Sequence, residues 1–395
     1  LRQPVQVVCR SAELMVVEHK LGEVDPEAYL RSYLKGAGSR MDLEKAPLLA
    51  IDLVQRHGDR HVHGLFRIHH TIVDHVAMDV LFEELAEILN GRPASLLPDT
   101  VPYRNFIAHM GRSDISVAEE HFRRVLGDVD EPTLPFGSIK TRGNDGHVKE
   151  TRLVLDDALV HQIRAVAKHY STGPAIVFHV AFGLLMAKCS GKDDVVFGTV
   201  LSGRMNGVPG ISRMQGVFIN TLPMRLDLRG IDVSKAVSVA QDMMLGLLEH
   251  EQTPLAVAQR CSGVDGEASL FGGVLNFAYT KPMDQSVPSG VDVIEAHEQT
   301  NYPLAVTVDD MGETFAFTVQ VREPLNPGRI ASYFREATVQ IVNALEGDSK
   351  QKVLDLSILS SIEREQVLQG FNATQAPYLK EALIHELFEA QAQRT

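Results

Sequence analysis

Two apolar, strand-like runs separated by a turn-prone segment lead directly into a pair of adjacent histidines. The runs cover residues 48–56 and 61–68, with His57-Gly58-Asp59 between them. This arrangement predicts a β-hairpin. His69 and His70 come at the end of its second strand, where consecutive side chains point to opposite faces. We therefore expect the two histidines to differ in role, one chemical and one structural.

The residue types in this segment favour acyl-transfer chemistry. An imidazole can accept or share a proton near neutral pH while an amine or hydroxyl attacks an acyl carbon. Asp74 lies four residues after His70. A carboxylate in that position is expected to pair with an arginine and to fix the loop that aims the imidazole. A histidine at a strand end is more often an ordinary core or surface residue, so the motif alone leaves both interpretations open.

The segment from His69 to Asp74 resembles the HHxxxDG signature of the condensation domains of nonribosomal peptide synthetases, which belong to the chloramphenicol-acetyltransferase-like superfamily. Two later segments are similar to further motifs of this family, in the same order: FGTVLSGR at residues 197–204 and GVFINTLPMR at residues 216–225. VPYRNF at residues 101–106 lies where the family has an aromatic-rich segment. His75 stands where the family usually has glycine, and Ala77 where serine is common. A side chain at position 75 is expected to narrow the substrate channel of such a domain or to tilt its donor site.

The resemblance implies an α/β fold of two chloramphenicol-acetyltransferase-like lobes, arranged as a V-shaped pseudo-dimer with a central channel. It also implies peptide-bond formation between an upstream acyl or peptidyl thioester and a downstream aminoacyl thioester. Both would be carried on the phosphopantetheine of partner carrier domains, with no cofactor bound directly. The resemblance also implies roles for individual residues. His70 is expected to be the catalytic residue, and His69, Asp74 and Arg204 are expected to support it, with Asp74 paired to Arg204. His75 and Asn301 are expected along the channel, and Asn220 and Arg225 in strand packing.

The same resemblance predicts four regions along the chain. Residues 1–145 form the N-terminal lobe, residues 146–347 the C-terminal lobe, residues 348–372 a linker, and residues 373–395 the beginning of an adenylation domain. The polar, glycine-bearing stretch 141–146 marks the boundary between the lobes. Leu1-Arg2 resembles the tail of an early family motif, so we expect the first strand and helix of the domain to be missing from this chain.

Periodicity and breaker residues predict the regular elements. Expected helices cover residues 80–89, 117–126, 157–169, 175–189, 234–249 and 327–345. Expected strands cover residues 150–155, 193–200, 272–279 and 315–321. Asn326 is a plausible N-cap for the last of these helices, and Pro327 suits its first position, where no amide donor is needed.

Composition excludes several other classes of protein. The chain has 395 residues and a net charge of −13 without a basic stripe, which argues against nucleic-acid binding. Its three cysteines, Cys9, Cys189 and Cys261, are far apart, so neither a disulfide framework nor a zinc ribbon is expected. No apolar run approaches the ~20 residues needed to span a bilayer. A cytoplasmic protein without membrane partners is therefore expected.

Four alternatives remain beside this interpretation. The first is a metal site built from the crowded histidines His57, His61, His63, His69, His70 and His75, although HExxH and cysteine-pair patterns are absent. The second is a catalytically silent platform that docks a carrier or a tailoring enzyme. The third is an epimerase or plant-type acyltransferase of related fold. The form of the 216–225 motif argues against the epimerase, and the absence of a DFGWG segment argues against the plant-type acyltransferase. The fourth is phosphate binding by the glycine-bearing 203–216 stretch, whose residue order matches no phosphate loop.

Overall fold

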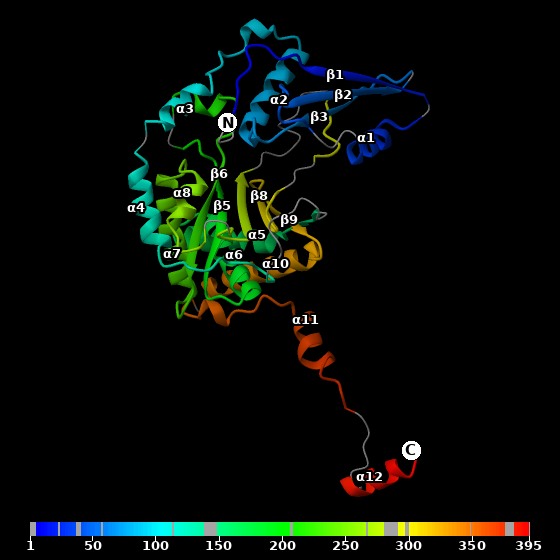
Figure 1. The fold of residues 1–395 in the computed structure, drawn as a ribbon, viewed down its shortest axis with the longest axis vertical. Helices are drawn as coiled ribbons and strands as arrows, with labels where there is room; N and C mark the ends of the chain where they lie inside the picture. Colours follow the sequence, from blue (N-terminus) through cyan, green and yellow to red (C-terminus); the bar gives the residue numbers. More distant parts are fainter. Residues whose placement is uncertain are drawn as a thin grey trace.

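The computed structural model describes two lobes and a C-terminal segment (Figure 1). The described residues are 5–22, 24–36, 41–56, 58–112, 114–137, 148–205, 208–265, 268–279, 291–296, 300–347, 349–375 and 383–394. The predicted lobe boundary at 141–146, the Leu1-Arg2 motif and His57 lie outside them.

The first lobe is built on a three-stranded sheet of order β1-β2-β3. Strand β1 is parallel to β2, and β2 is antiparallel to β3, with Leu49 opposite Ile68. Helices α1 and α2 belong to this lobe, and the edge-to-face contact between Phe66 of β3 and Phe82 of α2 joins sheet and helix. The elements up to α4 are β1 (Met15–Leu21), α1 (Pro26–Lys35), β2 (Leu49–Arg56), β3 (His63–Ile68), α2 (His75–Leu89), the 3₁₀ helix η2 (Ala94–Leu96), α3 (Arg104–Met110) and α4 (Ile115–Leu126).

The second lobe is built on a six-stranded mixed sheet of order β4-β9-β8-β7-β5-β6. Helices α5, α6 and α10 lie together against this sheet in Figure 1. The elements are β4 (Val148–Val154), α5 (Asp157–His169), α6 (Pro174–Ser190), β5 (Asp194–Leu201), η3 (Ile211–Arg213), β6 (Asn220–Asp227), α7 (Val233–Glu249), α8 (Leu255–Arg260), β7 (Gly273–Tyr279), β8 (Leu304–Asp310), β9 (Phe315–Arg322) and α10 (Pro327–Glu346).

Helix α6 explains why the second lobe holds the main core. It is apolar all round, a pattern typical of helices enclosed in a core, and every residue from Ile176 to Ala187 is buried. Phenylalanines of α6, β9 and α10 contact one another there, with Phe317 and Phe334 4.7 Å apart between ring centroids. Helix α4 crosses from the first part of the chain to this lobe and buries Phe122 and Leu126 in the same core.

Short polar side chains begin many of the helices. Asp74, Asp156 and Asp232 each accept a hydrogen bond from a backbone N–H in the first turn of α2, α5 and α7. Asn326 does the same for α10, whose first residue is Pro327, as predicted. These caps satisfy amides that have no partner within the helix.

The regular elements agree closely with the sequence predictions, with two differences near the histidine motif. The hairpin is present, but its second strand begins at His63 rather than at residue 61, since residues 58–62 belong to the connection. The helix expected at 80–89 begins at His75, because the Asp74 cap starts it more than one turn earlier. Strands β1 and β8 and helices α1, α3 and α8 add to the predicted set.

The C-terminal segment first packs on the second lobe and then leaves it (Figure 1). Leu356 and Ile358 are buried after η4 (Val353–Asp355). Beyond them come α11 (Ser361–Glu365), a π-helical turn at Gln366–Gly370 and α12 (Ile384–Ala392). Within the described part of the chain, no single helix is long and apolar enough to cross a membrane.

Candidate active site

His70 follows the end of β3 on a loop that holds its imidazole by one nitrogen. His69 N–H still donates to the Leu48 carbonyl at 3.0 Å, which continues the hairpin for one residue. At His70 the chain turns, and Nδ1 lies 2.7 Å from the Val73 carbonyl oxygen. A carbonyl oxygen can only accept, so Nδ1 carries a proton, and in the neutral ring the lone pair is on Nε2. The loop thus fixes the tautomer that a proton acceptor requires.

His69 is held in the opposite tautomer. The backbone N–H of Thr71 donates to His69 Nδ1 at 3.2 Å, and the Thr71 hydroxyl lies 2.8 Å from the same nitrogen. Nδ1 is therefore the acceptor, and the ring closes the tight turn that follows β3. This local bonding supports the expectation that His69 stabilises the loop.

Asp74 is buried and binds three groups at once. Its Oδ1 accepts from Arg204 Nη2 at 2.7 Å and from the Ala77 N–H at 2.9 Å, while its Oδ2 accepts from the Phe218 N–H at 3.0 Å. The Asp74 side chain has no exposed surface, and that of Arg204 is 8% exposed. The predicted pairing of Asp74 with Arg204 is confirmed. The carboxylate caps α2 and anchors it to the second lobe.

The Arg204 loop is shaped by glycine and by an aromatic ring. Gly203 has φ of +65°, and a Cβ at this position would lie 1.7 Å from the Phe218 carbonyl oxygen, so only glycine fits. The Arg204 guanidinium then lies over the Phe218 ring, 3.9 Å from its centroid, and donates to the carbonyls of Ile211 and Met214. These contacts hold the guanidinium beside Asp74, and the close approach of the Phe218 backbone accounts for the glycine at position 203.

His75 is the first residue of α2, and its exposed ring stands beside His70. The two imidazole centroids are 6.0 Å apart in an edge-to-face arrangement. Because the helical conformation here allows any side chain, the family's usual glycine is not required by the backbone of this chain. The place of His75 on the donor side of the channel stays a prediction.

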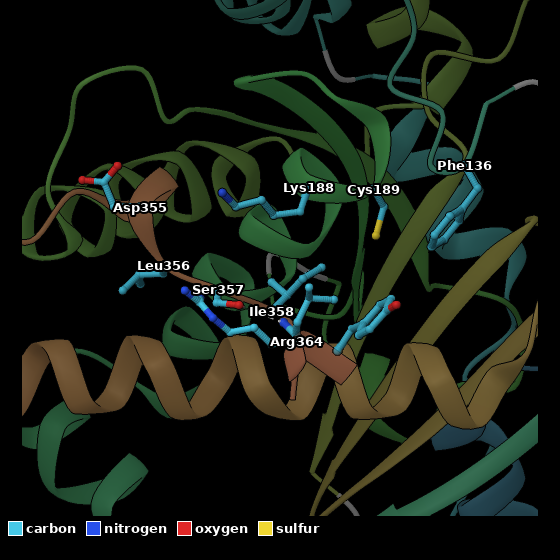
Figure 2. Close-up of a pocket in the computed structure, with 10 residues that line it drawn as sticks. Phe136, Lys188, Cys189, Asp355, Leu356, Ser357, Ile358 and Arg364 are labelled. Carbon is cyan, nitrogen blue, oxygen red and sulfur yellow. Dashed lines mark hydrogen bonds between the residues drawn. The ribbon is translucent and has the colours of Figure 1, made fainter. Parts of the chain in front are cut away.

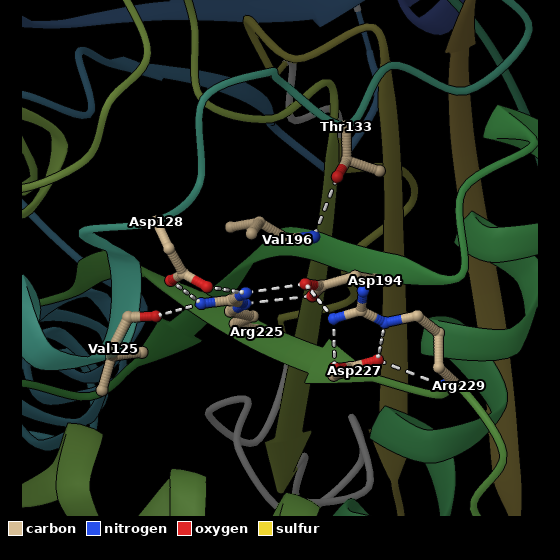
Figure 3. A network of polar contacts seen from close by, with 8 residues as sticks. All are labelled: Val125, Asp128, Thr133, Asp194, Val196, Arg225, Asp227 and Arg229. Carbon is tan, nitrogen blue, oxygen red and sulfur yellow. Dashed lines mark hydrogen bonds and ion pairs between the residues drawn. The ribbon is translucent and has the colours of Figure 1, made fainter.

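Asn220 and Arg225 have the structural roles expected of them. Asn220 donates its side-chain amide to the carbonyls of Glu251 and Thr253 at 2.9 and 2.6 Å. Arg225 joins Asp194 of β5 to Asp128 beyond α4, with N–O distances from 2.5 to 3.0 Å (Figure 3). The side-chain hydrogen bond from Arg225 lowers the pKa of Asp128 to about 2. Asn301 is exposed, and its carbonyl accepts from Arg322 at 2.9 Å, so its place along the channel stays a prediction.

An aromatic contact next to the site was not predicted. Tyr103, Phe106 and Phe218 form a small second core together with Ile211 and Met214, and the Tyr103 hydroxyl donates to the Val217 carbonyl at 2.6 Å. Burial, and secondarily the charge of Asp74, raises the pKa of Tyr103. The aromatic-rich segment 101–106 was the available signal, but its partners are more than a hundred residues away in sequence.

Two further features bear on the alternative functions. Among the described residues, no group of three or more His, Cys, Asp or Glu side chains is arranged to hold a metal ion, and His57 lies outside them. A cavity of about 530 Å³ lies between the second lobe and the C-terminal segment, where Lys188, Cys189 and Arg364 line it (Figure 2). Burial raises the pKa of Cys189 to about 12. This cavity is lined by none of the predicted site residues.

Comparison with known proteins identifies a family for this chain. The condensation domain family matches residues 1–368. The chain is 36% identical to malpibaldin synthetase and 38% identical to malpinin synthetase, both from Mortierella alpina, over its whole length. It spans only 7% and 5% of those proteins.

A solved four-domain nonribosomal peptide synthetase bound to AMP and glycine has the same fold. Its TM-score is 0.77 at 14% identity, and the match covers 97% of this chain and 31% of that one. The expected two-lobed chloramphenicol-acetyltransferase-like fold is confirmed. The chain therefore belongs to the condensation domain family of the nonribosomal peptide synthetases.

Proposed function

We propose that this domain forms a peptide bond between two thioesters delivered by carrier domains. The amine of a downstream aminoacyl thioester attacks the carbonyl carbon of the upstream acyl thioester. A C–N bond forms, the C–S bond breaks, and the upstream phosphopantetheine leaves as a thiol while the amine loses a proton. No cofactor beyond these phosphopantetheine arms enters the reaction.

The observation that carries this proposal is the hydrogen bond from His70 Nδ1 to the Val73 carbonyl, 2.7 Å long. Because Nδ1 donates to this carbonyl, the lone pair of the neutral ring is on Nε2, and we assign this nitrogen to take the amine proton or to orient the amine toward the thioester. A positioned acid–base group contributes ~10²–10⁴-fold to a rate. Holding both tethered substrates in one channel contributes ~7–11 kcal/mol in favourable cases.

The remaining residues of the site hold this geometry. Asp74 and Arg204 join the α2 cap to the second lobe at 2.7 Å, and His69 closes the turn before His70. We assign His75 to the donor side of the channel because its ring stands beside that of His70. Asn301 is assigned to the channel as well, on the resemblance alone.

The domain is proposed to work within a longer module, between two carrier domains and beside an adenylation domain. Leu356 and Ile358 are buried on the second lobe, as suits the linker of residues 348–372. On α12, by contrast, Ile384 and Phe388 are 87% and 73% exposed, as suits the opening helix of a separate domain. Cys9, Cys189 and Cys261 are free thiols, which is compatible with the reducing cytoplasm proposed for this protein.

The test is reconstitution of the full-length module with loaded upstream and downstream carriers, followed by detection of the dipeptidyl thioester. We expect His70→Ala to lower the single-turnover rate by ~10²–10⁴-fold without a change of fold. His69→Ala is the matched control at the neighbouring position and should act mainly through stability. Near-normal rates with His70→Ala would refute the catalytic assignment. A wild-type module that binds both carriers and forms no product would instead support the silent platform, which the departure at His75 keeps as the second candidate.

A further inference from the structure

We propose that Tyr103 is a positioning residue, which aims the imidazole of His70 by clamping the backbone of residues 216–218 against the Val73–Asp74 peptide unit. This inference rests on the proposed function of His70. Tyr103 lies outside the histidine motif and precedes α3.

One peptide unit links the histidine loop to the second lobe. Its carbonyl, from Val73, accepts the hydrogen bond of His70 Nδ1 at 2.7 Å. Its N–H, from Asp74, donates to the Gly216 carbonyl at 3.2 Å. Because the peptide unit is planar, the direction of the Asp74 N–H also sets the direction of the Val73 carbonyl. The Gly216 carbonyl therefore orients the group that orients His70.

Tyr103 holds this glycine by packing and by a hydrogen bond. A Cβ at Gly216 would lie 2.2 Å from Tyr103 Cδ2, and Gly216 has φ of +156°, so the absence of a side chain lets the ring lie directly on the backbone. The Tyr103 hydroxyl donates to the next carbonyl, that of Val217, at 2.6 Å. The ring also meets Phe218 edge to face, with centroids 5.2 Å apart.

Two of the three clamped residues bind Asp74, one at its backbone and the other at its carboxylate. Gly216 accepts from the Asp74 N–H, and the Phe218 N–H donates to Asp74 Oδ2 at 3.0 Å. Phe218 also carries the guanidinium of Arg204 on its ring. A shift of the 216–218 backbone would therefore move both the Val73–Asp74 peptide unit and the Asp74 carboxylate, and with them the imidazole of His70. Tyr103 acts through these groups, and we assign it no contact with substrate.

The test is Tyr103→Phe, which removes the hydroxyl and keeps the ring. The matched control is Tyr170→Phe, which removes a hydroxyl that donates to the Leu345 carbonyl at 3.3 Å in the second lobe. Imidazole nitrogens are observed by NMR in ¹⁵N-histidine-labelled protein, with the signals of His70 assigned by their loss in His70→Gln. The rate of dipeptidyl thioester formation is measured in the full-length module.

We expect the wild type and Tyr170→Phe to show widely separated Nδ1 and Nε2 signals for His70, as a fixed tautomer requires. In Tyr103→Phe these signals should move toward each other. The kcat should fall about 2- to 10-fold, the effect of one lost hydrogen bond, with the KM for both carriers unchanged. Tyr103→Leu, which also uncovers Gly216, should show larger changes of both kinds.

The inference is overturned if both Tyr103 variants leave the His70 signals and kcat as in the wild type. It is also overturned if Tyr170→Phe shifts them equally, since that effect would be global. The NMR measurement needs no turnover, so it decides the role of Tyr103 even if the wild type forms no product. Loss of the proposed function and loss of this inference are therefore distinguishable.

Discussion

The buried ion pair between Asp74 and Arg204 offers the sharpest test of how the two lobes support the site. Replacing Asp74 by alanine removes the ion pair, the cap of α2 and the acceptor of the Phe218 N–H. Asp74→Asn keeps a side-chain oxygen for the cap, since asparagine is also a good N-cap, and removes the charge. Arg204→Met removes the cation and retains much of the aliphatic contact with Phe218.

The magnitude follows from burial and distance. At the observed 2.7 Å, two unit charges attract with ~6 kcal/mol at an effective dielectric constant of about 20. Desolvation offsets much of this attraction, and removal of one partner from a buried pair typically costs ~3–5 kcal/mol. We expect Asp74→Asn and Arg204→Met to fall in this range. Asp74→Ala should cost about 1 kcal/mol more, the usual worth of an N-cap.

The assay is a double-mutant cycle on the free energy of unfolding, measured by chemical denaturation. Because Asp74→Asn/Arg204→Met leaves no charge stranded, the double variant should be more stable than the sum of the single losses predicts. The expected coupling is ~2–3 kcal/mol, within the range for residues in direct contact. As a control, Arg152→Ala breaks an ion pair with Asp309 in which Arg152 is 52% exposed, and should cost no more than ~1 kcal/mol.

Additive losses at Asp74 and Arg204, with no coupling energy, would refute the reasoning. The contact would then contribute nothing as a pair, and Asp74 would have to be reconsidered as a participant in the proton chemistry.

Two further predictions concern histidines. His75→Gly should widen the range of donor thioesters accepted without abolishing turnover, because it removes the ring beside His70. Competition between small and bulky donor thioesters measures this range. An unchanged preference would show that His75 points away from the donor. His179 is fully buried, and burial lowers its pKa to about 4 from the usual 6.5, so the folded protein holds it neutral while the unfolded chain binds a proton. The resulting stability is present above pH 6.5 and is lost as the pH falls from 6.5 toward 4, with a loss of about 2 kcal/mol between pH 7 and 5. Chemical denaturation across that range should show that the free energy of unfolding falls more steeply in the wild type than in His179→Gln. Parallel pH profiles of the two proteins would contradict this prediction.

Local sequence determined the regular elements and the chemical character of the site. Apolar runs with a turn between them predict the hairpin, and its second strand ends at Ile68, directly before His69. Side-chain caps and Pro327 place the start of α10 at the predicted residue. These features depend on interactions within one turn of helix or across one short connection, so they can be read from neighbouring residues.

The assignment of His70, Asp74 and Arg204 to one site came from resemblance to a family rather than from local pattern. Asp74 and Arg204 are 130 residues apart in sequence. Nothing in either segment alone specifies that they meet, because a surface arginine and a buried one look alike in sequence. The resemblance supplied the pairing, and the geometry confirmed it.

Only the tertiary structure decided how the imidazole is held. The path of the chain brings Tyr103 to Val217, 114 residues later, and lays its ring on Gly216. It also determines that His69 and His70, identical in type and adjacent in sequence, are held in opposite tautomers by Thr71 and by the Val73 carbonyl. Side-chain type determines what an imidazole can do, but the direction of its lone pair depends on which backbone groups the fold brings to each ring nitrogen.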